Sequence, residues 1–167
     1  QTAPEILESV FKTAGLASGD DYSLSLQKTY TKREYCVQYR ESDWAFACRL
    51  MEEEGIHYFF EHSDGKHVLT LGDNAEVHPP IAGEATLPFR PPLGALSDAE
   101  HVSRLHYSEE VRPGKMTLRD FDFKKPSLLL EGVSEGAEDT DLEVYDHPGD
   151  YEVPADGTAL AKIRLEE

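Results

Sequence analysis

Residues 33–62 constrain the fold of this chain more than any other segment, because nearly every local signal in them agrees. The segment begins with apolar and aromatic residues that alternate with polar ones, the pattern of a half-buried strand. These alternating residues are Tyr35, Val37 and Tyr39. A helix should follow, since Ser42 offers a side-chain oxygen to its first amides and Gly55 allows a left-handed stop. Aromatic residues at 56–60 then predict a second strand, so we expect a strand–helix–strand unit.

Apolar side chains within this unit are predicted to form a rigid scaffold core. On the helix they share one face, and on the strand that follows they are mostly aromatic. The predicted scaffold residues are Trp44, Phe46, Leu50, Met51, Ile56, Tyr58 and Phe60. Two interpretations of the aromatic strand stay open. It is either a central strand covered on both faces, or one of its faces packs against another subunit.

The predicted helix ends on three acidic residues, which carry the wrong charge for the negative end of a helix dipole. These residues are Glu52, Glu53 and Glu54. We therefore predict that a basic side chain or a neighbouring subunit compensates them. The basic candidates within this chain are Arg33, Arg40 and Arg49.

Proline and charge patterns divide the chain into three stretches. Residues 1–72 contain a helix, a strand, the capped helix and a hairpin. Residues 73–98 carry five of the ten prolines and predict an extended connector, since proline cannot donate to a β ladder. Residues 99–167 predict a second set of strands, an acidic loop and a C-terminal helix. Runs of strands with few helices favour an α+β fold, mainly antiparallel and barrel-like.

The remaining elements are predicted from periodicity and turn residues. The expected strands are 22–30, 67–71, 102–111, 116–123, 127–131 and 142–145. One helix is expected over residues 5–14. A last helix should be capped by Asp156, with Ala159, Leu160 and Ile163 on one face. Residues 131–143 are acidic and contain glycine, which predicts a mobile loop.

The charge balance makes several classes of partner unfavourable. The chain has 16 Lys and Arg against 33 Asp and Glu, a net charge of −17. Nucleic acid and anionic membranes both reward basic surface, so we expect neither as a partner. No run approaches the roughly 20 apolar residues of a membrane span, and no stable membrane insertion is expected. The chain begins with Gln1 and not with methionine, from which we expect a piece of a longer protein.

Residues that could support catalysis or metal binding do not form a recognisable pattern. His57, His62 and His67 bracket the hairpin, but structural zinc sites normally use closely spaced Cys or His pairs. Cys36 and Cys48 do not make a disulfide framework in a chain of 167 residues. The sequence has no nucleophile elbow, dinucleotide fingerprint or phosphate loop. We therefore predict no enzyme, cofactor or metal site, with an acidic hydrolase that uses a carboxylate pair as a competing hypothesis.

Several runs resemble the VgrG spike proteins of type VI secretion systems. The runs are VQYRESD at 37–43, RLMEEEGI at 49–56, YFFE at 58–61, RPG at 112–114, TLRDFDF at 117–123, LEVYDHPG at 142–149 and LAKIRLEE at 160–167. They span most of the chain in the order that the family shows. The resemblance is therefore specific and does not rest on a single motif.

The resemblance implies the part of VgrG that is similar to the hub of contractile phage tails, which is built on β-barrel domains. It implies a homotrimer in the full-length parent, seated on the Hcp tube and used to puncture target cells and deliver effectors, with effectors or adaptors as partners. It also implies assembly in the bacterial cytoplasm, followed by secretion or injection into a target cell. The residues themselves leave one alternative, an acidic binding module that docks an effector or other basic partner through residues 131–143.

Overall fold

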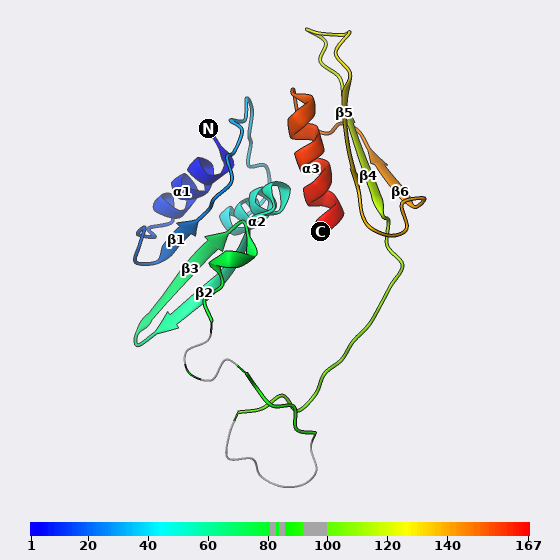
Figure 1. Ribbon diagram of the computed structural model, residues 1–167. Helices are drawn as coiled ribbons and strands as arrows, with labels where there is room; N and C mark the ends of the chain where they lie inside the picture. Colours follow the sequence, from blue (N-terminus) through cyan, green and yellow to red (C-terminus); the bar gives the residue numbers. More distant parts are fainter. Residues whose placement is uncertain (81–82, 84–85, 92–99) are drawn as a thin grey trace. The chain divides into compact units, whose positions relative to one another are not determined.

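The computed structural model describes residues 1–80, 83, 86–91 and 100–167 (Figure 1). The chain separates into two units, one formed by residues 1–77 and 112–167 and the other by residues 78–111. The elements, all in the first unit, are α1 (Ala3–Thr13), β1 (Tyr22–Ser25), α2 (Asp43–Glu54), β2 (His57–Ser63), β3 (Lys66–Gly72), the 3-10 turn η1 (Ala75–Val77), β4 (Lys115–Asp120), β5 (Leu130–Glu135), β6 (Glu143–Asp146) and α3 (Pro154–Glu166). The predicted division at residues 72 and 98 stays a prediction.

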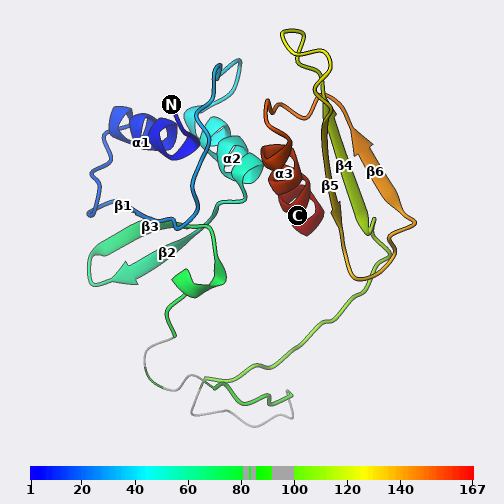
Figure 2. The ribbon, with the colours of Figure 1, turned by 45° about the horizontal axis from the view of Figure 1, so that its top comes forward.

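The described residues have the predicted α+β content, but their sheets differ from the prediction. Two three-stranded sheets have the orders β1-β3-β2 and β5-β4-β6 (Figure 2). Each is mixed, since β3 pairs parallel with β1 and antiparallel with β2, while β4 pairs parallel with β6 and antiparallel with β5. No closed barrel forms among the described residues, and the sheets are not purely antiparallel, so the α+β content is confirmed and the barrel stays a prediction. The long connection between β1 and β3, which contains α2, permits parallel pairing.

Helices α1 and α2 pack on the sheet of β1, β2 and β3, and the first hydrophobic core lies between them. Helix α1 starts at a capping box, in which the amide of Glu5 donates to Thr2 Oγ1 at 3.4 Å and the amide of Thr2 donates to Glu5 Oε2 at 2.8 Å. The helix thus begins two residues before the predicted start. The buried members of this core are Leu7, Phe11, Tyr22, Phe46, Ala47, Leu50, Met51, Ile56, Leu69 and Leu71.

The ends of α2 are confirmed as predicted. Ser42 Oγ accepts a hydrogen bond from the amide of Ala45 at 3.2 Å, and Gly55 adopts the left-handed conformation with φ of 65°. The hairpin that follows pairs Tyr58 with Leu71 and Phe60 with Leu69, so these four side chains share one face of the sheet. That is the face on which Leu69 and Leu71 meet the helices.

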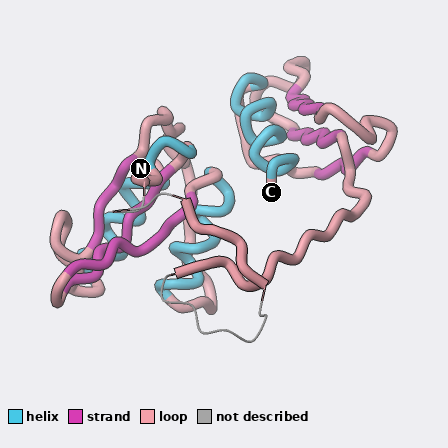
Figure 3. The backbone as a smooth tube through the Cα atoms, turned by 60° about the horizontal axis from the view of Figure 1, so that its bottom comes forward, coloured by secondary structure: helices cyan, strands magenta, loops and turns pink. Residues whose placement is uncertain are grey.

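The strand predicted over residues 35–39 is wrong. This segment is irregular, and Tyr35, Val37 and Tyr39 are 84%, 45% and 71% exposed. Strands occur only in the two sheets within the described part of the chain, as the magenta segments of Figure 3 show. Alternation indicates that one side of a segment is apolar, but it does not supply a partner strand. The strand predicted over 102–111 is wrong for the same reason, with a single bridge between Val102 and Phe89.

The sheet of β4, β5 and β6 packs against α3 through a second core. Its buried residues are Met116, Leu118, Leu130, Tyr151 and Ala161. Strand β5 occupies the start of the predicted acidic loop, so that loop prediction was wrong for residues 131–135. The physical reason is that the acidic side chain of Glu131 points outward while Leu130 and Gly132 are buried.

The contacts of α3 also differ from those predicted. Its N-cap is Val153, which makes no side-chain cap, and Asp156 lies inside the first turn. The buried positions of the helix are Gly157 and Ala161, while Ala159 is exposed. Small residues are buried because the helix backbone approaches β5 closely: a Cβ added at Gly132 would lie 2.1 Å from the carbonyl carbon of Gly157.

Candidate functional site

The strand–helix–strand segment of residues 33–62 divides the predicted scaffold residues into two groups. One group lies in the first core, with exposures of 5% or less: Phe46, Leu50, Met51 and Ile56. The other group is exposed at the surface: Trp44 at 44%, Tyr58 at 42% and Phe60 at 49%. These three residues therefore lie outside the first core, and the scaffold role of all seven stays a prediction.

The position of β2 explains why its aromatic side chains are exposed. Strand β2 lies at the edge of its sheet, with β3 as its neighbour on one side. Tyr58 and Phe60 point to the same face as Leu69 and Leu71, which are buried on the central strand β3, while the two aromatic side chains on the edge stay partly exposed. Ring-to-ring contacts join Trp44, at the start of α2, to Tyr58 and then Phe60 on β2. We call Trp44, Tyr58 and Phe60 the aromatic surface.

The rings of the aromatic surface contact one another in an ordered series. Trp44 and Tyr58 have centroids 5.2 Å apart at an angle of 79°, and Tyr58 and Phe60 lie 6.3 Å apart at 87°. Such edge-to-face pairs each contribute about 0.5–1.5 kcal/mol beyond their buried area. The row is therefore held in place while its outer side stays open, as expected of a contact surface.

The glutamates at the end of α2 have basic partners, as predicted. Arg33 Nη1 lies 2.5 Å from Glu53 Oε2, and Arg33 Nη2 lies 2.7 Å from Glu54 Oε1. Arg49 Nη1 lies 3.1 Å from Glu53 Oε1, and hydrogen bonds to Glu41 and Glu53 raise the pKa of the Arg49 guanidinium. The prediction is confirmed for Arg33 and Arg49.

The other members of that prediction have different surroundings. Arg40 lies over the ring of Tyr39 at 5.2 Å from its centroid. Glu52 has an acidic neighbour, since a hydrogen bond with Glu167 and the negative charge of Glu167 raise the pKa of the Glu52 carboxyl. Two of the three glutamates thus tie α2 to the segment before it, where Arg33 lies.

A buried carboxylate that the sequence analysis missed fixes the chain after β1. Asp73 is 6% exposed and accepts from the amides of Gln27 at 2.8 Å and Lys28 at 2.7 Å, and from the hydroxyl of Tyr30 at 2.9 Å. Burial acts to raise the pKa of Asp73, but these hydrogen bonds and one from Asn74 outweigh it and lower that pKa. An Asp directly after a strand-ending glycine could have suggested such a cap.

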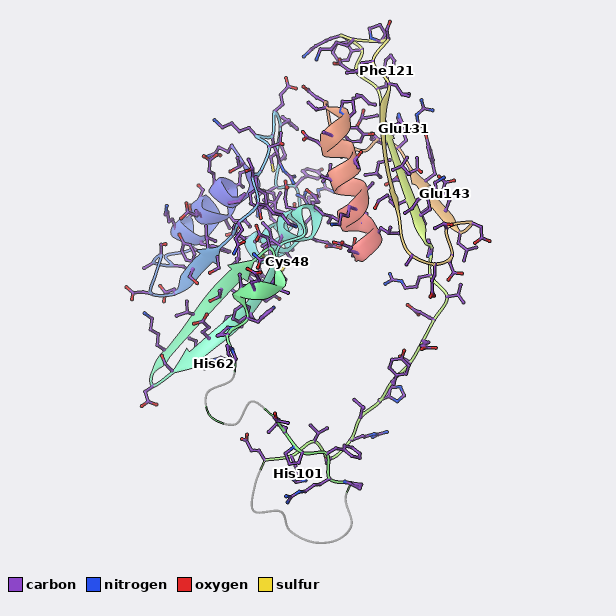
Figure 4. The ribbon with its side chains drawn as sticks, viewed as in Figure 1. Cys48, His62, His101, Phe121, Glu131 and Glu143 are labelled. Atoms are coloured by element: carbon purple, nitrogen blue, oxygen red, sulfur yellow. The ribbon has the colours of Figure 1, made fainter. Side chains whose placement is uncertain are left out.

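The thiol of Cys48 lacks the low pKa that activates a catalytic cysteine. Both cysteines are free thiols. Burial, with a smaller effect of the Glu52 charge, raises the pKa of Cys48, which Figure 4 labels on α2. A raised pKa favours the unreactive thiol over the thiolate.

The hairpin brings together two of the three histidines considered in the sequence. His62 and His67 are paired across the strands, and their Nδ1 atoms are 2.6 Å apart. His57 lies at the other end of β2, opposite Gly72. Among the described residues, no group of three or more His, Cys, Asp or Glu side chains is placed to hold a metal ion. Nor does the described part of the chain include a helix with the length and apolarity needed to cross a membrane.

Two carboxylates of the predicted acidic loop, Glu131 and Glu143, have partners on β4, and Figure 4 labels both. Thr117 donates to Glu143 at 2.6 Å, and this hydrogen bond lowers the pKa of the Glu143 carboxyl. Arg119 lies 3.5 Å from Glu131, and Lys115 lies 3.6 Å from Glu143. Glu131 and Glu143 thus have basic neighbours within the sheet.

Comparison with known proteins decides the family. The whole chain, residues 1–167, matches the family model described as phage tail baseplate hub (GPD). The chain belongs to this family. A structural role of this kind agrees with a site made of packed rings and ion pairs.

Relatives of this hub chain include proteins named as type VI secretion spikes. VgrG1c and VgrG1a of Pseudomonas aeruginosa, both named type VI secretion system spike proteins, are 37% and 38% identical over 99% of this chain. The actin cross-linking toxin VgrG1 of Vibrio cholerae is 34% identical over 99% of the chain. The expected resemblance to VgrG is confirmed. The chain spans 23%, 26% and 15% of the lengths of these relatives.

One solved structure also matches. The E. coli c3393 protein, described as a component of the type VI secretion system with structural similarity to the T4 bacteriophage tail proteins gp27 and gp5, is 26% identical, with a TM-score of 0.46. The match covers 56% of this chain and 25% of the other. At this score the likeness supports no conclusion about the fold.

Proposed function

We propose that this chain is a structural piece of the hub of a type VI secretion spike. The observation that carries the proposal is the family match over all 167 residues, together with the identity of about 37% to proteins named as spikes. The role is mechanical: the buried residues of α2 and β2 keep the module rigid, and rigid modules transmit force without deforming. The proposed scaffold residues are Phe46, Leu50, Met51 and Ile56.

The proposal extends to the whole protein of which this chain is a part. The full-length parent is a homotrimer that sits on the Hcp tube, punctures target cells and carries effectors or adaptors. It assembles in the bacterial cytoplasm and is then secreted or injected. This part of the protein has no catalytic role, and any enzymatic activity belongs to other regions of the parent.

The aromatic surface gives the hub a face for assembly. Monomeric proteins rarely expose contiguous rows of aromatic side chains, and aromatic residues are enriched where protein surfaces meet. Tyr58 and Phe60 are therefore proposed to pack against another subunit, the second of the two interpretations that the sequence left open. The buried residues beneath them hold the strand in register.

The mass of the full-length parent in solution tests the proposal. Light scattering after size-exclusion chromatography should give three times the mass of one polypeptide. The chain of residues 1–167 should be measured beside it, to separate the contribution of this module from that of the remainder. A monomeric parent at micromolar concentration would refute the hub assignment.

A further inference from the structure

The hairpin of β2 and β3 carries, near its turn, a pair of imidazoles that no feature of the spike hub explains. His62 and His67 lie directly opposite each other in the antiparallel register, and both are exposed. Side chains in such a pair have Cβ atoms about 4.5–5.5 Å apart, which brings both rings within reach of one ion. Their Nδ1 atoms are in fact 2.6 Å apart, and the ring planes meet at 73°.

From this geometry we propose that His62 and His67 form a binding site for one divalent transition-metal ion of the Cu²⁺ and Zn²⁺ class, with water in the remaining positions. Each neutral imidazole can carry its proton on Nε2, which leaves a lone pair on each Nδ1 atom. In the hydrogen-bonded pair one Nδ1 carries the proton; when the metal binds, this proton moves to Nε2 of the same ring, so that both Nδ1 lone pairs face the ion. This site does not depend on the proposed role in the spike.

The distances require only a small adjustment. A zinc ion binds imidazole nitrogen at about 2.0–2.1 Å, so two ligands at a tetrahedral angle lie roughly 3.3 Å apart. The present separation is 2.6 Å, and rotation of the exposed rings can supply the difference. The site is open, since two protein ligands leave coordination positions for water or for a donor from a partner.

The surroundings hold the pair in position. Phe60 stacks on His62, with centroids 6.3 Å apart and planes at 18°. On the other strand, Lys66 ties the end of the hairpin to Asp20 through a contact of 2.9 Å. Gly65 makes the turn with φ of 70°. Because the paired strands fix the backbone at both positions and Phe60 packs against His62, only a small rotation of the rings is needed and little conformational entropy is lost when an ion binds.

The preferred ions follow from the ligand type. Imidazole nitrogen suits Cu²⁺, Zn²⁺ and Ni²⁺, with Cu²⁺ bound most tightly, whereas Mg²⁺ and Ca²⁺ prefer oxygen ligands. The chain also carries 33 acidic residues, which attract divalent ions weakly and at no specific site. Excess Mg²⁺ should occupy these carboxylates and leave the histidine pair available.

The first test is a calorimetric titration of Zn²⁺ into the chain of residues 1–167 with Mg²⁺ in excess. One Zn²⁺ should bind per chain. Loss of a direct ligand in His67→Gln should weaken binding at least as much as loss of an outer-shell partner does, which is roughly 10–100-fold. The matched control, His106→Gln, removes an exposed histidine of the other unit and should leave the affinity unchanged. Equal Zn²⁺ affinity in the unaltered chain and in His67→Gln would overturn the proposal.

A second measurement needs no variant, so a folding defect in His67→Gln cannot obscure the result. Substoichiometric Cu²⁺ broadens the amide resonances of nuclei near the ion in a ¹H–¹⁵N spectrum. The broadening should centre on residues 60–69, around the ends of β2 and β3. Broadening spread over acidic surfaces, with residues 60–69 unaffected, would show nonspecific binding alone and reject the site.

Discussion

At the scale of single residues, the buried carboxylate of Asp73 orders the segment that follows β1. Its carboxylate holds the turn after β1 by accepting from the amides of Gln27 and Lys28 and from the hydroxyl of Tyr30. Asp73→Asn keeps the shape of the side chain, but its NH₂ group would face the backbone amides and the hydroxyl that now donate to the carboxylate. We expect a loss of about 1–3 kcal/mol in the free energy of unfolding, measured in urea. Asp141→Asn, at an exposed position, is the control and should change it little.

The lowered pKa of Asp73 also predicts how stability depends on pH. The folded-state pKa lies below the unfolded one, so the contribution is complete above about pH 4 and is lost as pH falls through the folded-state pKa. The difference in unfolding free energy between the unaltered chain and Asp73→Asn should therefore shrink from pH 6 to pH values near 2.5. A difference that stays constant over this range would contradict the assignment.

Arg33 links the segment before α2 to the end of that helix. It contacts both Glu53 and Glu54, and Glu54 is only 16% exposed in its side chain. Arg33→Met removes the guanidinium, so that both carboxylates lose their hydrogen bonds and ion pairs with residue 33. The free energy of unfolding should therefore fall by about 1–3 kcal/mol. The control is Lys12→Met, which breaks the exposed pair with Glu8 at 3.8 Å and should cost about 0.5 kcal/mol or less. Comparable losses in both variants would refute the special role of Arg33.

At the scale of elements, α3 and β5 meet through glycine. A Cβ at Gly132 would lie 2.1 Å from the carbonyl carbon and 2.3 Å from the carbonyl oxygen of Gly157, both backbone atoms. Gly132→Ala should therefore push the helix away and cost about 1–3 kcal/mol in thermal or chemical unfolding. Gly136→Ala is the matched control, because its nearest contact would be an ordinary 3.5 Å. Equal stability of the two variants would contradict the close approach.

The same elements show which parts of the fold could be predicted from the sequence. Helix α2 was predicted because Ser42 and Gly55 act locally, within a few residues of the helix ends. Strand β5 was predicted only at its first two residues, 130 and 131, because acidic residues give the rest of its segment the composition of a loop, while its stability comes from β4 and α3. The buried face of α3 was missed because Gly157 is buried by its closeness to β5, which no helical period reveals.

At the scale of the whole molecule, the runs that resemble VgrG predicted the family. They did not predict how the strands pair or which aromatic side chains are buried. Parallel pairing of β1 with β3 depends on residues about 47 positions apart, such as Tyr22 and Leu69, and local patterns carry no record of it. Local patterns also could not reveal that the strand predicted at 35–39 finds no partner strand in the described part of the chain. The apolar character of Tyr58 and Phe60 was evident, but their place on an edge strand was not.

The aromatic side chains on the edge strand β2 should matter more for assembly of the parent than for the stability of this chain. Tyr58→Ser with Phe60→Ser should change the unfolding free energy of residues 1–167 by about 1–2 kcal/mol or less, since both side chains are largely outside the core. In the full-length parent, however, the same double variant should weaken the trimer, so that light scattering shows a smaller mass on dilution. Tyr107→Ser, which alters a 77% exposed ring of the other unit, should leave that mass unchanged. A double variant that dissociates at the same concentration as the unaltered parent would exclude the aromatic surface from the subunit contact.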